Sequence, residues 1–312
     1  LFQFVALSLL FCSPVMSQDV TSKKVVFALP TKTQDPFWQV VINGCRDASQ
    51  ALGVELEILP YAPENIMSEK NVLDLALSRP SNATVMVLYR QHPELIAALE
   101  KSQTPNRIIQ IINSGESVLA KSTLKANFIG MNDYAAGFTM GQGLATQAPK
   151  KILFISHLPK DTSVSSARYN GLKAALPSAQ IIYLNTSAST TKNPIDTIKN
   201  ALREHSDIDT VATLGPKSLS TLVEAIGLNA TSTVSFNITT FDLSHEIADL
   251  MLSGKILFTI DQQPYLQGYY AVTNANLFGD YRLHPFGSFL TGPAIIYPHD
   301  ILAIYPYIGV TR

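Results

Sequence analysis

Short apolar runs alternate with helical apolar spacings along most of this chain. The first run extends from Val25 to Leu29 and is closed by Pro30. After a polar loop, apolar and small residues recur every three or four positions as far as Gly53. A short unbroken apolar run indicates a strand buried on both faces, and the second pattern indicates an amphipathic helix. Asp35 and Pro36 are typical of a helix start, and Gly53 is typical of a helix end.

The same alternation occurs twice. Because short loops connect the alternating elements, parallel sheets with right-handed crossovers are favoured. We predict an α/β fold of two doubly wound parallel-sheet lobes, joined at a hinge by three crossovers near 130, 261 and 290. The predicted lobes are residues 24–130 with 262–290, and residues 131–261 with 291–312. Later strands are predicted at 54–59, 83–88, 108–112, 126–130, 151–155, 180–184, 210–214, 234–241 and 256–261, then a helix to 276 and short strands at 287–290 and 294–297.

Composition narrows the possible partners and cofactors. The 312 residues carry a formal net charge of -1, and only 15% of them are charged. No basic footprint for nucleic acid or anionic lipid is present, so neither is expected as a partner. Cys45 is the only cysteine beyond the N-terminal segment, and the six histidines show no metal-ligand spacing. We therefore predict no disulfide within the exported chain, no metal site and no cofactor.

The N-terminal segment has its own pattern. Residues 1–11 are almost wholly apolar, and small residues follow as far as Ser17. This pattern predicts an export signal over residues 1–17, a mature chain that starts at Gln18, and a soluble periplasmic protein. A lipoprotein anchored through Cys12 is the alternative, but the bulky Phe11 disfavours it.

Polar and aromatic residues gather where predicted strands end. In parallel α/β sheets this edge binds ligands, and two lobes facing each other by their strand ends would form one cleft. Phe37 and Trp38 offer ring faces that suit a sugar, or they simply cover the core. Asp35, Asp242 and Asp133 are ligand contacts or helix caps, and capping is the expected role of Asp133. The strand-end positions are Thr31 to Trp38, Asn113-Ser114, Met131 to Asp133, 157–168, Gly215-Pro216, Asp242 and Asp261-Gln262.

Four motifs resemble the type I periplasmic binding proteins of the ribose, galactose and autoinducer-2 group, over about residues 24–307. They are Asp35-Pro-Phe-Trp38, Gly130-Met-Asn-Asp-Tyr-Ala-Ala-Gly137, Ser166-Ala-Arg-Tyr-Asn-Gly171, and Phe241-Asp242 followed by Thr259-Ile-Asp-Gln-Gln-Pro264. The resemblance implies a hinged, two-lobed protein with a ligand between its lobes.

The same resemblance implies roles for individual residues. Phe37 and Trp38 would sandwich a sugar ring, and either Arg168 or Ser166 would face the ligand from the second lobe. Asn113-Ser114 and Gly215 stand where the ribose binder has other polar groups, so ribose itself is not expected. The candidate ligand-binding residues are Thr31, Asp35, Phe37, Trp38, Asn113, Ser166, Arg168, Asp242, Asp261 and Gln262, with the two carboxylates at 35 and 242 as hydroxyl acceptors and Gln262 at the hinge.

The function implied by the resemblance is capture of a small sugar or polyol by hinge closure, for delivery to the permease of an ABC importer. The alternative is a sensing component that presents its closed form to a membrane kinase or chemoreceptor. A glycosidase would need two carboxylates, for example Asp35 and Asp242. The sequence has no nucleophile elbow, phosphate loop or metal motif, so we expect a binding protein and not an enzyme.

Overall fold

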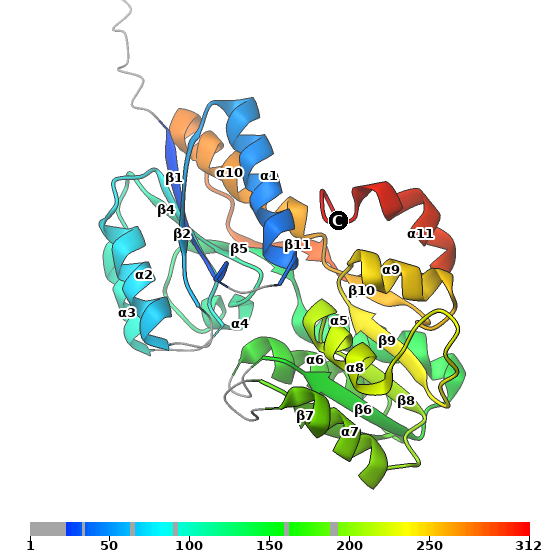
Figure 1. The fold of residues 1–312 in the computed structure, drawn as a ribbon. Coiled ribbons are helices and arrows are strands. Elements are labelled where there is room, and N and C mark those ends of the chain that lie inside the picture. The colour runs from blue at the N-terminus through cyan, green and yellow to red at the C-terminus, as the bar shows by residue number, and fades with distance from the viewer. Residues whose placement is uncertain (1–22, 33–34, 63–65, 90–92, 159–161, 188–192) are drawn as a thin grey trace, which may run out of the picture.

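The computed structural model describes residues 23–32, 35–62, 66–89, 93–158, 162–187 and 193–312, which form two α/β lobes (Figure 1). The first lobe is built on a fully parallel sheet of order β11-β5-β4-β3-β1-β2. Its strands are β1 (Lys24–Leu29), β2 (Glu55–Pro60), β3 (Ala83–Met86), β4 (Ile108–Ile112), β5 (Ala126–Met131) and β11 (Gly287–Gly292). Its helices are α1 (Phe37–Leu52), α2 (Ile66–Ser78), α3 (Pro93–Ser102), α4 (Glu116–Leu119) and α10 (Pro264–Tyr281).

The second lobe repeats this plan. Its sheet has the order β12-β10-β9-β8-β6-β7 and is parallel except for the antiparallel pair of β10 and β12. The strands are β6 (Lys151–Ser156), β7 (Gln180–Asn185), β8 (Thr210–Thr213), β9 (Asn237–Phe241), β10 (Thr259–Asp261) and β12 (Ala294–Ile296). The helices are α5 (Asp133–Leu144), α6 (Ser163–Ala175), α7 (Pro194–Glu204), α8 (Pro216–Ile226), α9 (His245–Leu252) and α11 (Pro298–Ile304), with 3-10 turns at Ala145–Gln147 and Tyr305–Tyr307. The predicted fold class is confirmed.

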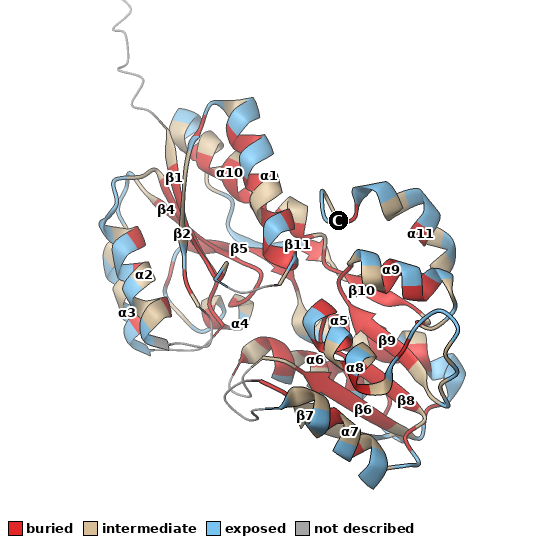
Figure 2. Cartoon of the chain, viewed as in Figure 1, coloured by how far each residue is buried: buried red, intermediate tan, exposed pale blue. Residues whose placement is uncertain are grey.

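Strand β1 shows why the apolar runs were informative. Val25, Phe27 and Leu29 pack in the cluster that contains the α1 side chains, whereas Val26 and Ala28 pack with the α2 and α3 side chains. Alternate residues of a strand point to opposite faces, so a strand covered by helices on both faces must be apolar throughout. In Figure 2 most strands at the centre of each lobe are buried, and the helices that cover them are exposed on their outer sides.

Each lobe contains one closely packed helix pair. A methyl group at Gly44 of α1 would overlap the Tyr265 carbonyl oxygen, and one at Gly268 of α10 would overlap that of Val41. Gly137 of α5 and Gly171 of α6 approach each other's helix backbone in the same way. These glycines therefore set how closely α1 packs on α10 and how closely α5 packs on α6.

The chain passes between the two sheets three times, after β5, after β10 and after β11. The third crossing lies against the second, because a Cβ on Gly292 would come within 2.9 Å of the Asp261 carbonyl oxygen and 3.0 Å of the Gln262 Cα. These adjacent segments form the hinge.

The structure differs from the predicted elements in several places. The strands predicted at 234–241 and 256–261 begin only at Asn237 and Thr259. Helix α10 continues to Tyr281, five residues beyond the predicted end at Asn276, because Phe278 is buried and Lys23 Nζ donates to Asn276 Oδ1 at 2.6 Å. Helices α4 and α11 were not predicted. Within the described ranges, no helix combines the length and apolar character needed to cross a bilayer. The predicted export signal and Cys12 lie outside the described residues.

Candidate functional site

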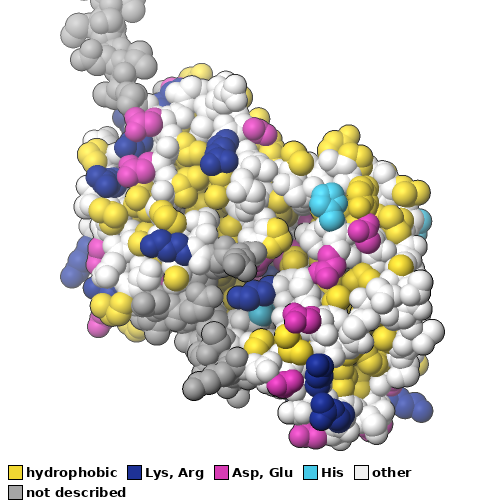
Figure 3. Space-filling model, in the orientation of Figure 1, with side chains coloured by type: hydrophobic (Ala, Val, Ile, Leu, Met, Phe, Trp, Pro, Cys, Tyr) yellow, Lys and Arg dark blue, Asp and Glu magenta, His cyan; other side chains and the backbone are white. Residues whose placement is uncertain are grey.

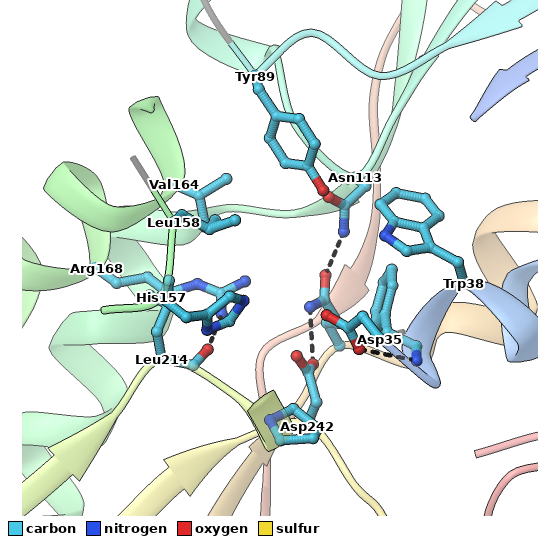
Figure 4. Close-up of a pocket in the computed structure, with 13 residues that line it drawn as sticks. Asp35, Trp38, Tyr89, Asn113, His157, Leu158, Val164, Arg168, Leu214 and Asp242 are labelled. Atoms are coloured by element: carbon cyan, nitrogen blue, oxygen red, sulfur yellow. Dashed lines mark hydrogen bonds between the residues drawn. The ribbon is translucent and has the colours of Figure 1, made fainter. Parts of the chain in front are cut away.

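A polar pocket lies between the lobes at the carboxyl ends of their strands (Figure 4). The space between its side chains, counted with its open mouth, is about 400 Å³. Its lining comes from the first lobe (Asp35, Phe37, Trp38, Tyr89 and Asn113), the second lobe (His157, Leu158, Val164, Arg168, Leu214, Pro216 and Asp242) and the hinge (Gln262).

The aromatic wall comes from the start of α1. Phe37 and Trp38 meet edge to face, with ring centroids 4.9 Å apart and an interplanar angle of 84°. Both belong to the buried core, and Trp38 is only 4% exposed. The sequence left two interpretations open for these rings, a place in the pocket or a place over the core. The structure gives them both places.

Three amide and carboxylate side chains form the floor of the pocket. Asn113 Nδ2 donates to Gln262 Oε1 at 3.0 Å, and Gln262 Nε2 donates to Asp242 Oδ1 at 2.7 Å. Gln267 Nε2 also donates to Gln262 Oε1, at 3.2 Å. Asn113 follows β4 of the first lobe and Asp242 follows β9 of the second, so Gln262 links both lobes at the hinge, the position that the sequence predicted for it.

The backbone directs both ends of this chain of hydrogen bonds. Asn113 and Asp242 each have a φ of 63°, a left-handed conformation that Asn and Asp tolerate better than most residues. The backbone N–H of Asn113 donates to Ile129 O, and that of Asp242 donates to Ile260 O. Asp242 is not a helix cap, because Ser244 caps α9 by accepting from the Ile247 N–H.

Burial raises the pKa values of both carboxylates in the pocket. The pKa of Asp242 rises to about 7, although Arg168 and the Gln262 hydrogen bond oppose the rise. The pKa of Asp35 is also raised by burial, which the hydrogen bond from the Phe37 N–H partly offsets. That bond is 3.1 Å long. Asp35 was predicted as the N-cap of α1, but Pro36 holds that position, so Asp35 lies one residue earlier than predicted while its side chain lines the pocket.

Arg168 enters the pocket from α6 and is held from three directions. Its Nε donates to Asp133 Oδ1 at 2.8 Å, its Nη1 donates to Leu214 O at 3.1 Å, and its guanidinium lies 4.4 Å from the centroid of the Phe241 ring. The expectation that Asp133 caps α5 was wrong. Asn132 caps this helix by accepting from the Ala135 N–H, which leaves Asp133 to pair with the buried guanidinium.

Three of the predicted site residues do not line the pocket. Ser166 is exposed, and its hydroxyl donates to carbonyl groups in the first turn of its own helix. The carboxylate of Asp261 is buried at the hinge, where it accepts from the Gln263 N–H at 2.8 Å and pairs with Arg312. Thr31 lies beside the end of β1, outside the set of lining residues. Of the two candidates in α6, Arg168 is the one that faces the pocket.

Sequence reasoning missed Tyr89, and it placed His157 at a strand end within reach of the cleft without selecting it as a site residue. Tyr89 follows β3 and His157 follows β6, so their places at strand ends were the available signal. Burial lowers the pKa of His157 to about 3, so its imidazole is neutral at physiological pH. Both therefore offer neutral hydrogen-bonding groups beside two acidic side chains and one basic side chain.

Hydrogen-bonding side chains and aromatic rings make up most of the lining of the site. Among the described residues, no group of three or more His, Cys, Asp or Glu side chains is arranged to hold a metal ion. The lining pairs ring faces with donors and acceptors of fixed direction, which suits a small molecule that carries several hydroxyl groups.

Comparisons with known proteins agree with this arrangement. The model of the periplasmic binding protein domain family matches residues 25–278. Periplasmic protein TorT of Escherichia coli K12 is 22% identical over 255 residues, which are 80% of this chain and 70% of TorT.

Two solved structures share the fold. A carbohydrate transporter from Acidothermus cellulolyticus 11B, in complex with myo-inositol, superposes with a TM-score of 0.83 and 21% identity, covering 93% of this chain and 100% of the other. A carbohydrate transporter solute-binding protein from Agrobacterium radiobacter, in complex with D-arabinose, gives a TM-score of 0.78 and 18% identity, covering 93% and 99%. With its two hinged lobes, the pocket between them and a family model that spans most of its length, this chain belongs to the periplasmic binding protein domain family.

Proposed function

We propose that this protein captures a small sugar or polyol between its lobes and holds it by hinge closure. The observation that carries the proposal is a single polar pocket to which both lobes and the hinge contribute. A ligand that hydrogen-bonds to Asp35 on one side and to Asp242 and Arg168 on the other joins the lobes, so it stabilises their closed arrangement. The complexes of structural relatives with myo-inositol and D-arabinose support this ligand class.

In this proposal the two carboxylates bind and do not catalyse. Asp35 accepts from the N–H of Phe37, and Asp242 accepts from Gln262. Each is thereby oriented as an acceptor, and the remaining acceptor capacity of Asp242 suits ligand hydroxyl groups. The ring faces of Phe37 and Trp38 supply the apolar contact that a sugar or polyol also needs.

The proposal places the protein in the periplasm, where it delivers its ligand to the permease of an ABC importer. Presentation of the closed form to a membrane sensor is the competing role of the same pocket. The face seen in Figure 3 carries scattered charges of both signs, which fits a small neutral ligand better than nucleic acid. A deletion strain separates the roles, because loss of importer delivery abolishes uptake of labelled ligand, whereas loss of sensing abolishes only the transcriptional response.

Calorimetric titration of pentoses, hexoses, polyols and autoinducer-2 tests the binding itself. We expect one class of neutral polyhydroxy compound to bind with a stoichiometry of one. Asp35→Ala should weaken that binding by about 10- to 100-fold, the value of a hydrogen bond to a charged group. Asp74→Ala is the matched control, because Asp74 is half exposed on α2 and pairs only with Lys70 among the described residues. A panel with no binder, or equal affinities for the two variants, would refute the proposal.

A further inference from the structure

The two lobes also touch on the side of the pocket away from the hinge. Ser163, the first residue of α6, donates its backbone N–H to the Tyr89 carbonyl oxygen at 3.2 Å. Its Oγ lies 3.2 Å from Ser114 Oγ and 3.5 Å from Tyr89 O. Tyr89 and Ser114 belong to the first lobe and Ser163 belongs to the second. We call these three residues the interlobe clasp.

Each half of the clasp is fixed within its own lobe. Ser114 is 1% exposed, its Oγ donates to Leu88 O at 3.0 Å, and its carbonyl oxygen accepts from the Leu88 N–H at 3.0 Å. Ser163 is held by α6, and its N–H is one of the first-turn donors that have no acceptor within their own helix. Closure gives this donor an acceptor on the other lobe, and opening returns both groups to water. The clasp therefore stabilises the closed arrangement and not the folding of either lobe.

The clasp lies beside the pocket and shares only Tyr89 with its lining. Neither Ser114 nor Ser163 lines the pocket, whereas the neighbouring side chains of Tyr89 and Val164 do. The clasp residues Ser114 and Ser163 are uncharged, so the clasp does not depend on pH near neutrality. Changes at Ser163 can thus alter the closed population while every ligand-contacting side chain stays in place.

We propose that Ser163 is an affinity-determining residue that acts without touching the ligand, because the interlobe clasp sets the closed fraction of the ligand-free chain. The apparent dissociation constant equals the intrinsic constant divided by the competent fraction, so a weaker clasp lowers affinity in proportion to the closed population. The statement about affinity rests on the proposed function, whereas the statement about the closed fraction does not.

Ser163→Pro removes the clasp with little disturbance of α6. It deletes the N–H and the hydroxyl together, at the first helical position, where proline is well tolerated. The preceding Thr162 has φ -77° and ψ 137°, the extended conformation that a following proline requires. His245→Pro is the matched control, because His245 is the exposed first residue of α9 in the same lobe and follows Ser244, which is also extended.

Pulsed electron spin resonance measures the closed fraction directly. Nitroxides at Lys101→Cys on α3 and Asn200→Cys on α7 label exposed positions on the two lobes (Figure 1). Cys12→Ser removes one background thiol, and the other, Cys45, is buried. In ligand-free protein we expect a short and a long distance. Ser163→Pro should lower the short-to-long ratio by about 5- to 50-fold, as the loss of two hydrogen bonds predicts, and His245→Pro should leave it unchanged.

Titration with myo-inositol and D-arabinose completes the test. Whichever compound binds the wild type should bind Ser163→Pro more weakly, by the factor by which the closed fraction falls. Equal distance distributions for Ser163→Pro and wild type, including a wild type that is wholly open, would overturn the proposal. A melting temperature lowered by Ser163→Pro alone, with unchanged distances, would show a merely structural role and overturn it too. If neither compound binds the wild type, the proposed function loses its support while the distances still decide on the clasp.

Discussion

Asp242 makes the stability of the ligand-free protein depend on pH. Burial raises its pKa to about 7 in the folded chain, whereas an aspartate in an unfolded chain titrates near about 3.9. Between these values the folded state binds more protons than the unfolded state. The contribution of this carboxyl group to stability is therefore largest at low pH and falls as the pH rises from about 4 to about 7.

Asp242→Asn should remove that dependence. The asparagine amide oxygen can still accept from Gln262, so we expect the variant to gain about 2–4 kcal/mol relative to wild type between pH 4 and pH 8. Urea unfolding at unit steps of pH measures the difference, with Asp74→Asn as an exposed control. A difference that stays constant over this range would contradict the assignment.

Asp133 and Arg168 form a buried ion pair whose members depend on each other. Their side chains are 13% and 4% exposed, with Oδ1 and Nε 2.8 Å apart. Removing one partner leaves an uncompensated buried charge, so Asp133→Ala should cost about 3–5 kcal/mol of stability. Adding Arg168→Met to Asp133→Ala should cost much less than the sum of the two single changes. Additive costs in denaturant unfolding would show that the pair is not coupled.

At the scale of elements, the contact between α1 and α10 depends on two glycines. Gly44→Ala would place a methyl group against the Tyr265 carbonyl oxygen and force the helices apart, at an expected cost of about 2–3 kcal/mol. Gly279→Ala, in the partner helix α10, meets the flexible Lys23 side chain at 3.0 Å. That control should be neutral or up to about 1 kcal/mol more stable, through helix propensity. Thermal unfolding of both variants provides the comparison, and equal melting temperatures would contradict it.

Local patterns predicted the elements well where local forces decide them. The unbroken apolar run of β1 predicted its burial on both faces. The adjacent residues Asp35 and Pro36 predicted that a helix starts there. Interactions between distant residues were invisible to this reasoning. Asp133 was assigned to its own helix because its partner Arg168 lies 35 residues away, and α10 was ended too early because Lys23, 253 residues away, holds Asn276.

In the candidate site, too, some features could be predicted from local sequence and others could not. Positions after strands were predictable, because parallel sheets gather these positions at one edge. The direction of each side chain was not, and it separates Arg168, which lines the pocket, from Ser166 on the exposed side of the same helix. Asp261 was misplaced for a related reason, since its carboxylate is taken up by Gln263 and Arg312 at the hinge.

At the scale of the whole molecule, the core does not stop at the hinge. One continuous cluster of buried apolar side chains contains Val25 and Trp38 of the first lobe and Phe154 and Phe241 of the second. The lobes should therefore unfold together, in one calorimetric transition whose enthalpy equals the van't Hoff value. Two separate transitions, or a lobe that melts while Trp38 fluorescence is unchanged, would contradict this expectation.

The two sheet orders correspond strand for strand, and this makes Asn113 and Asp242 twins. Both follow the equivalent strand of their lobe, both have a φ of 63°, and both bond to Gln262. The amide of Asn113 donates to Gln262, whereas the carboxyl group of Asp242 accepts from it. That difference gives the row of hydrogen bonds a polarity, from the first lobe to the second, and fixes which way the Gln262 amide points.

A ligand above this floor consequently meets a polarised surface, and we expect this polarity to favour one orientation of the ligand. Exchanging the twins, as Asn113→Asp with Asp242→Asn, should reverse the polarity and turn the Gln262 amide over. Gln267 can follow, because its Oε1 has no hydrogen-bond partner among the described residues. The exchanged protein should fold as stably as wild type but prefer a different stereoisomer, which calorimetric titration with epimeric sugars would reveal. The polarity of this one pair of residues would then contribute to the handedness of recognition.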